Sequence, residues 1–191
     1  MKKSLVFFFL LTCGLVFVDQ SLKIWVVFQQ KSLLYSGQPI LRFGDLLNIV
    51  YVENNGVAFG FLANLGPAFK FFLSLFRLFA VIFISLFFVS IIKKRRVCLL
   101  GCVPFSLILA GALGNVLDSV FYGFLGLNLE GSGLFQGKVI DMFAFSFFPP
   151  VFNLADSFVC VGVFCLFVFQ TNIILNKKNS IWVDFIGLFK R

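Results

Sequence analysis

The chain carries few side chains that could perform acid–base chemistry. Its 191 residues include no histidine, which removes His-based triads and most zinc chemistry. The carboxylates are Asp19, Asp45, Glu53, Asp118, Glu130, Asp141, Asp156 and Asp184. Two carboxylates that share a site cannot both ionise easily, so one keeps a proton while the other can take a proton from water. Water activated by a carboxylate pair is therefore the chemistry that these residue types favour.

Apolar residues dominate the rest of the chain. Hydrophobic residues make up 60% of it, with 31 Phe and a mean hydropathy of +1.03. A soluble domain of this length could not bury so much apolar surface, so we predict a single integral membrane domain over residues 1–191, of the all-α class. Four stretches approach the ~20 apolar residues that a membrane helix needs. The expected spans are residues 4–28, 68–92, 97–117 and 154–175.

Positive charge predicts the direction of these spans. Basic residues lie at Lys2 and Lys3, at "KKRR" (93–96), and at Lys177 and Lys178. The positive-inside bias then places both termini and the 93–96 link in the cytoplasm, and the long loops 29–67 and 118–153 outside. This bias and anionic lipid account for the net charge of +8, so no nucleic-acid partner is expected. The tail 181–191 is predicted to lie along the inner membrane surface.

With this topology, polar residues from five separate segments converge at the outer boundary of the membrane. They are Asp19 and Lys23 in the first span, Asn54 in the first outer loop, Asn115 and Asp118 at the end of the third span, Asp141 in the second outer loop, and Asn153 and Asp156 at the start of the fourth span. Polar side chains are costly at this depth, so their convergence predicts a functional site at the outer face.

Two Asn-x-x-Asp pairs have different structural alternatives. Asn153 and Asp156 have the spacing of a helix N-cap and its third residue, which alone could satisfy free amides. Capping does not explain Asn115 and Asp118, because an acid near a helix C-terminus meets the negative pole of the dipole. Spacing alone leaves open whether Asp118 or Asp141 is the partner of Asp156.

Other features also have simple structural explanations. Asp19 and Lys23 could form an ion pair on one helix face, and Asn54 could belong to a turn that leads into a strand. Arg77, inside the second span, is expected to face the other helices or to snorkel along its own turn. The cysteines at 13, 98, 102, 160 and 165 are expected to be small buried hydrophobes, without a metal site.

Several of these segments together resemble a known family. "VDQSLKIWV" (18–26), "NNGVAFGFL" (54–62), "GALGNVLD" (111–118), "VIDM" (139–142) and "FNLADS" (152–157) occur in the order found in the lipoprotein signal peptidases, or signal peptidase II. The resemblance covers nearly the whole chain, with all four spans in register. The combination of the Gly-Asn-x-x-Asp and Phe-Asn-x-Ala-Asp elements is highly specific.

The resemblance implies a four-helix aspartic endopeptidase of the bacterial inner membrane, with a small β-rich cradle in the first outer loop. Such an enzyme removes signal peptides from prolipoproteins, cutting before the diacylglyceryl-modified cysteine. The implied partners are lipidated prolipoproteins and membrane lipids; no cofactor, metal or second copy of the chain is required. The catalytic pair would be Asp141 and Asp156. The supporting or substrate-binding positions would be Asn54, Gly56, Asn115, Asp118, Asn153, Asp19 and Lys23.

The chain departs from the family pattern in three places. Ser119 follows Asp118, where the family usually has Arg, so we expect Ser119→Arg to be tolerated. Glu53 stands where a basic or neutral residue is more common. Residues 124–137 resemble an insertion before Asp141.

Three rival functions remain at this level. An ion channel or transporter would need polar residues through the depth of the bilayer, yet the inner halves of the third and fourth spans are almost uniformly apolar. Another class of intramembrane aspartic protease would need a Gly-x-Gly-Asp element, which is absent from the sequence. An inactive relative that only binds lipoproteins is the third alternative.

Overall fold

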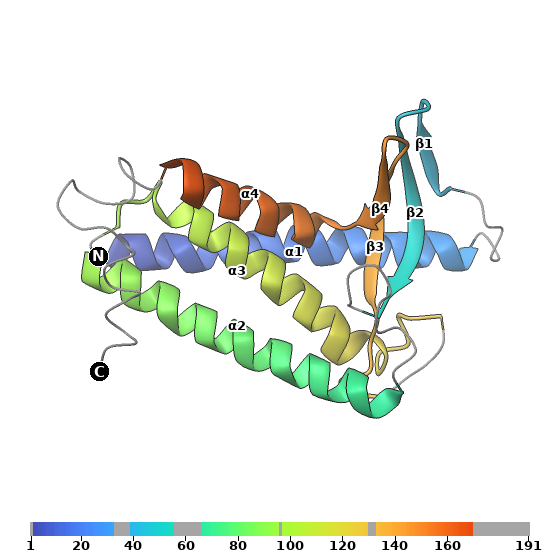
Figure 1. Cartoon of the computed structure of the whole chain (residues 1–191), viewed down its shortest axis with the longest axis horizontal. Coiled ribbons are helices and arrows are strands. Elements are labelled where there is room, and N and C mark those ends of the chain that lie inside the picture. Colours follow the sequence, from blue (N-terminus) through green and yellow to red (C-terminus); the bar gives the residue numbers. More distant parts are fainter. Residues whose placement is uncertain (1, 33–38, 56–65, 96, 130–132, 170–191) are drawn as a thin grey trace.

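A computed structural model describes residues 2–32, 39–55, 66–95, 97–129 and 133–169. The helices are α1 (Lys2–Ser32), α2 (Pro67–Arg95), α3 (Cys102–Leu117), its continuation η2 (Asp118–Tyr122), and α4 (Leu154–Phe169). The four α-helices run lengthwise beside one another, and a small sheet stands across one end of them (Figure 1). The start of α1 and the end of α2 lie at the opposite end, where Ser4 Oγ donates a hydrogen bond to the carbonyl of Val97 at 2.8 Å.

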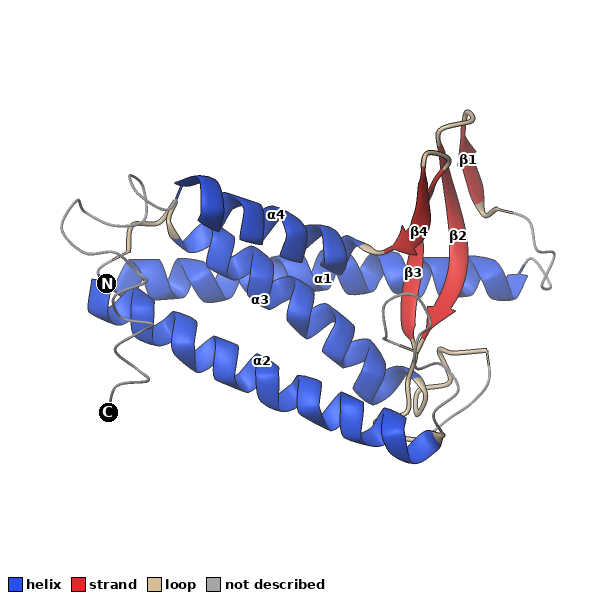
Figure 2. Cartoon of the chain, viewed as in Figure 1, coloured by secondary structure: helices blue, strands red, loops and turns tan. Residues whose placement is uncertain are grey.

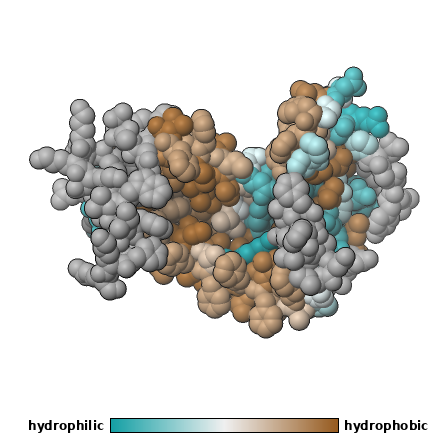
Figure 3. Space-filling view, in the orientation of Figure 1, coloured by the Kyte–Doolittle hydropathy of each residue, from teal (hydrophilic) through white to brown (hydrophobic). Residues whose placement is uncertain are grey.

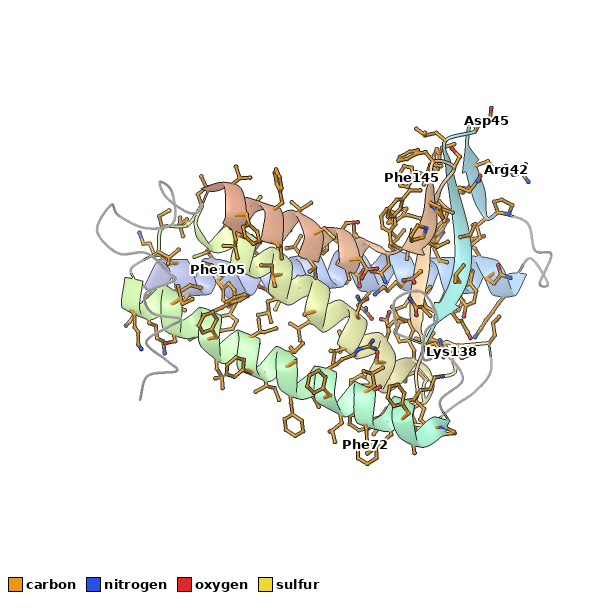
Figure 4. The ribbon with its side chains drawn as sticks, in the orientation of Figure 1. Arg42, Asp45, Phe72, Phe105, Lys138 and Phe145 are labelled. Carbon is orange, nitrogen blue, oxygen red and sulfur yellow. The ribbon has the colours of Figure 1, made fainter. Side chains whose placement is uncertain are left out.

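Three of the helices are long and apolar enough to cross a membrane. These candidate spans are Lys2–Lys31, Pro67–Lys94 and Cys102–Tyr122. α2 begins with Pro67, a residue that suits the first helical position. Its large apolar side chains that remain exposed lie on one face, as expected for contact with lipid: Phe72, Phe76, Phe79, Phe83 and Leu86. Figure 4 shows Phe72 directed away from the other helices.

The third and fourth helices differ from the spans expected from the sequence. α3 begins at Cys102 rather than at residue 97, after a turn that ends at Gly101. Pro104 lies in the first turn of α3, where its missing amide is tolerated. The described part of α4 has 16 residues, or about 24 Å of helix, which is less than the ~30 Å hydrocarbon core. Residues 170–175 of the expected fourth span lie outside the described residues.

α3 packs against the other three helices. Near the end remote from the sheet, apolar side chains from α1, α2 and α3 form a core that includes Phe8, Phe88, Ile92, Phe105 and Leu109. Glycines bring α3 and α4 into backbone contact. A Cβ at Gly111 would lie 2.2 Å from the carbonyl oxygen of Ala155, and one at Gly162 would lie 2.9 Å from that of Pro104. Any larger residue at these positions would separate the two helices.

Both long loops between the helices contribute strands to the sheet, shown in red in Figure 2. The antiparallel order is β1 (Leu41–Phe43), β2 (Leu47–Asn54), β3 (Val139–Phe145) and β4 (Phe148–Phe152). The expectation that the β-structure lies in the first outer loop is therefore incomplete, and Asp141 lies in a strand, opposite Val52. The pairing joins segments far apart in the chain, which local sequence patterns do not reveal. β4 contains Pro149 and Pro150, in keeping with its position at an edge of the sheet.

Candidate active site

A buried ion network ties three helices together beside the sheet. Lys23 Nζ lies 2.9 Å from Asp19 Oδ2 and 2.8 Å from Asp118 Oδ2, and all three side chains are 0% exposed. The other oxygen of Asp19 accepts a hydrogen bond from the amide of Ala155 at 2.9 Å, which satisfies a free donor at the start of α4. Buried charges persist only when they are paired and hydrogen-bonded, so this network has a structural role.

Gln20 and Tyr122 extend this network, and the sequence analysis missed both. Gln20 Nε2 donates to Asp118 Oδ1 at 2.9 Å and to the carbonyl of Gly114 at 3.2 Å. Tyr122 donates its hydroxyl hydrogen to Gln20 Oε1 at 3.0 Å. The signal that could have found Gln20 is its polarity within an apolar span, directly after Asp19.

The end of α3 brings this network close to the strands. Gly114 leaves room for Asp19, since a Cβ there would lie 2.5 Å from Asp19 Oδ2. After Leu117 the helix widens into the π-helix Asp118–Tyr122, a form often found at functional sites. Asp118 Oδ2 then accepts a hydrogen bond from the amide of Ile140 at 3.3 Å, which connects α3 to β3 beside Asp141.

Asn153 and Asp156 form the helix cap that their spacing predicts. Asn153 Oδ1 accepts from the Asp156 amide at 2.9 Å, and Asp156 Oδ2 accepts from the Asn153 amide at 3.2 Å. This reciprocal arrangement satisfies two backbone donors at the start of α4. It uses only one oxygen of Asp156 and leaves the side-chain amide of Asn153 available for other contacts.

Side-chain amides hold both carboxylates of the candidate pair. Asn153 Nδ2 donates to Asp141 Oδ1 at 2.7 Å, and Asn54 Nδ2 donates to Asp141 Oδ2 at 2.9 Å. Asn115 Nδ2 donates to Asp156 Oδ1 at 2.8 Å. Asn115 Oδ1 in turn accepts from Asn153 Nδ2 at 3.1 Å. Asn153 therefore contacts both carboxylates at once, and three asparagines from three elements fix their positions.

The environments of the two carboxylates differ. Asp141 is 3% exposed; burial raises the pKa of Asp141 to about 6, the negative charge of Asp156 adds to the increase, and the amides of Asn54 and Asn153 oppose it. Asp156 is only half-buried. Figure 3 shows a notch between the apolar helices and the sheet, with hydrophilic surface at its floor. A carboxyl group with a raised pKa beside one that reaches the surface is an arrangement suited to acid–base chemistry.

A second polar cluster holds the insertion-like segment against the sheet. Glu53 Oε2 forms an ion pair with Lys138 Nζ at 2.6 Å, while Glu53 Oε1 accepts from the Tyr51 hydroxyl and the Leu129 amide, each at 2.6 Å. Burial alone would raise the pKa of Glu53, but the hydrogen bonds from Lys138, Tyr51 and Leu129 lower it overall. The unusual Glu53 thus has its partner in Lys138, and residues 130–132 of the segment lie outside the described residues.

Eight of the nine expected site residues lie in this region, and Gly56 lies outside the described residues, as does the tail 181–191. Arg77 was expected to face the other helices or to snorkel along its own turn. The first alternative holds, because its Nη1 donates to Ser119 Oγ at 3.0 Å. Within the described part of the chain, no cluster of His, Cys, Asp and Glu side chains could hold a metal ion.

Known proteins resemble this chain in both sequence and fold. The family model described as signal peptidase (SPase) II matches residues 11–172. Similar curated proteins include the lipoprotein signal peptidase of Porphyromonas gingivalis, 37% identical over 185 residues, with 81% of this chain and 78% of that protein covered. The lipoprotein signal peptidase of Syntrophus aciditrophicus is 33% identical over 171 residues, covering 88% of this chain and 94% of that protein.

A solved structure also resembles this chain in fold. A bacterial membrane enzyme determined by the in meso method at 1.9 Å resolution matches with a TM-score of 0.59 and 26% identity, covering 86% of this chain and 92% of that one. The family match extends over both ends of the site, from before Asp19 to beyond Asp156. This chain is a member of the signal peptidase II family.

Proposed function

We propose that the protein is an aspartic endopeptidase that removes signal peptides from diacylglyceryl-modified prolipoproteins, cutting on the N-terminal side of the lipidated cysteine. Asp141 and Asp156 form its catalytic pair. Its similarity to proteins named lipoprotein signal peptidase supports the substrate class. The observation that carries the mechanism is that Asn153 bridges the two carboxylates. Its side-chain Nδ2 lies 2.7 Å from Asp141 Oδ1, and its backbone nitrogen lies 3.2 Å from Asp156 Oδ2.

The ion network argues for Asp141 rather than Asp118 as the partner of Asp156. Asp118 is fully buried and its oxygens already bind Lys23, Gln20 and the Ile140 amide. An acid held in this way cannot exchange protons without disrupting its ion pair with Lys23 and the hydrogen bonds that it accepts, which is costly in a buried site. Asp141 instead accepts hydrogen bonds from the neutral amides of Asn54 and Asn153, and its pKa, raised to about 6, lets it take up and release a proton closer to neutral pH than an ordinary carboxyl group.

The reaction needs only the two carboxyl groups and one water. Asp156, as the ionised partner, removes a proton from water while the oxygen attacks the scissile carbonyl carbon. Asp141 donates its proton to the carbonyl oxygen, which gives a neutral tetrahedral intermediate. When the C–N bond breaks, Asp156 returns its proton to the leaving nitrogen and Asp141 takes back the hydroxyl proton as the new carboxyl group forms. Both groups end as they began.

The walls of the notch suit an apolar substrate. The labelled side chain of Phe145 lies on the side of the sheet nearer α4 in Figure 4. Phe145 stacks on Phe152 with ring centroids 5.9 Å apart, and Phe143 lies 5.8 Å from the same ring. An aromatic wall opposite apolar helices would accommodate acyl chains and a signal-peptide segment beside the carboxylates. We place the site at the outer face of the bacterial inner membrane, with both termini in the cytoplasm, as the basic residues predict.

Single and double replacements of the two carboxylates test this proposal. Asp141→Asn and Asp156→Asn should each abolish conversion of a diacylglyceryl-modified prolipoprotein to its mature form. If the two groups act as a unit, the double variant should be little worse than either single variant. The measurement is cleavage by membranes that contain matched amounts of each variant. Asp45→Asn, in the exposed turn between β1 and β2, is the control and should cleave normally.

Two results would contradict the assignment. Cleavage by Asp141→Asn together with an inactive, normally inserted Asp118→Asn would transfer the pair to Asp118 and Asp156. Cleavage by Asp156→Asn would remove the aspartic mechanism altogether. A wild-type protein that binds the prolipoprotein without cutting it would instead be an inactive relative of the family.

A further inference from the structure

Arg77 is a charged residue within the span formed by α2. A guanidinium at this depth is costly and normally has a defined partner. The exposed phenylalanines of α2 occupy another face of the helix, while Arg77 is half-buried and directs Nη1 to Ser119 Oγ at 3.0 Å. α2 thus brings a cation to the end of α3, next to the candidate catalytic pair.

Ser119 is arranged to receive this cation. It is 1% exposed, and its hydroxyl donates its single hydrogen to the carbonyl of Asn115 at 2.9 Å, so Oγ can only accept from Arg77. The side chain of the same Asn115 donates to Asp156 Oδ1 at 2.8 Å. The guanidinium therefore binds the short segment that also orients Asp156, and its charge interacts with the Asp156 carboxylate.

The site has more acidic than basic groups, so a second cation besides Lys23 lowers its net negative charge. The charged groups of the site besides Asp156 are Lys23 and Asp19 of α1, Arg77 of α2, Asp118 at the end of α3, and Asp141 of β3. Lys23 is shared by Asp19 and Asp118, so this trio is net negative and cannot compensate Asp156. Arg77, which comes from a different helix, offsets part of this negative charge.

We propose that Arg77 is a positioning residue that offsets negative charge beside Asp156 and, through Ser119 and Asn115, holds this carboxylate in the orientation of the base. This inference rests on the function proposed above. It also changes the expectation for Ser119→Arg. Because Ser119 is buried against Arg77, an added guanidinium there would meet like charge, and the single variant should lose activity. Ser119→Arg should be accepted only when Arg77 is also replaced.

The test compares Arg77→Gln, Arg77→Lys and the exchange variant Arg77→Ser/Ser119→Arg with wild type, in detergent with a lipidated prolipoprotein as substrate. Arg77→Gln should lower kcat about tenfold, with little change in KM, and should shift the rise of kcat with pH upward, because the carboxyl pair loses an opposite charge. Arg77→Lys and the exchange variant should restore the wild-type pH profile. Lys70→Gln, two turns earlier on α2, is the matched control and should behave as wild type.

An Arg77→Gln enzyme with unchanged kcat and pH profile would overturn the inference. If Arg77→Gln does not accumulate in membranes, the exchange variant decides: a wild-type pH profile supports the proposal, and a shifted profile or an inactive, well-inserted protein overturns it. Failure of the proposed function is distinguishable, because Asp141→Asn and Asp156→Asn would then cleave the substrate. Inactive Asp variants beside a normal Arg77→Gln would overturn only the role of Arg77.

Discussion

At the scale of single residues, Asn153 combines a structural and a functional task. Its side-chain oxygen caps α4, and its side-chain amide binds Asp141 at 2.7 Å. Asn153 in "FNLADS" is therefore a helix cap through its side-chain oxygen and a partner of Asp141 through its side-chain nitrogen. Serine could keep the cap, since a hydroxyl oxygen accepts the same backbone hydrogen bond. It could not reach Asp141 as the amide does.

The variant Asn153→Ser separates these tasks. We expect its insertion and its melting temperature in detergent to stay close to wild type, because the cap is retained. Its cleavage rate should fall about tenfold, the size expected for losing one hydrogen bond that holds the Asp141 carboxyl group. Asn153→Ala, which also loses the cap, should be less stable by about 1 kcal/mol. Full activity in Asn153→Ser would mean that the amide contact with Asp141 is dispensable.

At the scale of elements, the close approach of α3 and α4 sets the position of Asp156. Asp156 lies directly after Ala155, whose carbonyl oxygen would be only 2.2 Å from a Cβ at Gly111. A backbone atom cannot move aside as a flexible side chain can. The glycines of "GALGNVLD" are thus part of how the carboxylates are placed, although they carry no chemistry.

Gly111→Ala should therefore separate the two helices and displace Asp156. We expect a loss of about 1–3 kcal/mol in stability, typical of overpacking, together with a large loss of cleavage. Gly14→Ala is the matched control, since a Cβ at Gly14 of α1 would meet no atom within 4 Å. Thermal unfolding in detergent and the cleavage assay measure both effects. Equal behaviour of the two alanine variants would show that the helix contact does not position the site.

At the scale of the whole molecule, two ends of different character flank an apolar body. The sheet and the polar network lie at one end, while the start of α1 and the end of α2, with Lys2, Lys3, Lys93 and Lys94, lie at the other (Figure 1). Exposed phenylalanines between the two ends suit contact with lipid. This polarity favours an orientation with the basic end in the cytoplasm.

Reporter fusions measure that orientation. A reporter that folds only outside the cytoplasm should be inactive when fused after Lys178, and active when a truncated chain is fused after Gly44, in the turn between β1 and β2. The reverse pattern would place the site on the cytoplasmic side, where it could not meet a translocated prolipoprotein. Activity at both sites would indicate a mixed topology and would contradict the positive-inside prediction.

The amino-acid sequence alone was enough to predict the membrane class, the approximate helical segments, the list of carboxylates and the family pattern. These follow from composition, hydropathy and short motifs, which are properties of neighbouring residues. The helix cap at Asn153 and Asp156 and the ion pair of Asp19 and Lys23 were also foreseeable, because both depend on spacing within one helix.

The contacts between distant segments could be seen only in the folded structure. It showed Asp118 bound to Lys23, Asn54 bound to Asp141, and Arg77 bound to Ser119. It also joined strands from two loops far apart in the sequence into one sheet. No local pattern encodes these partners, because each side chain finds a partner in whichever helix or strand packs beside it. In a low-dielectric interior each buried charge and amide must find such a partner, and the packing of the helices determines which one.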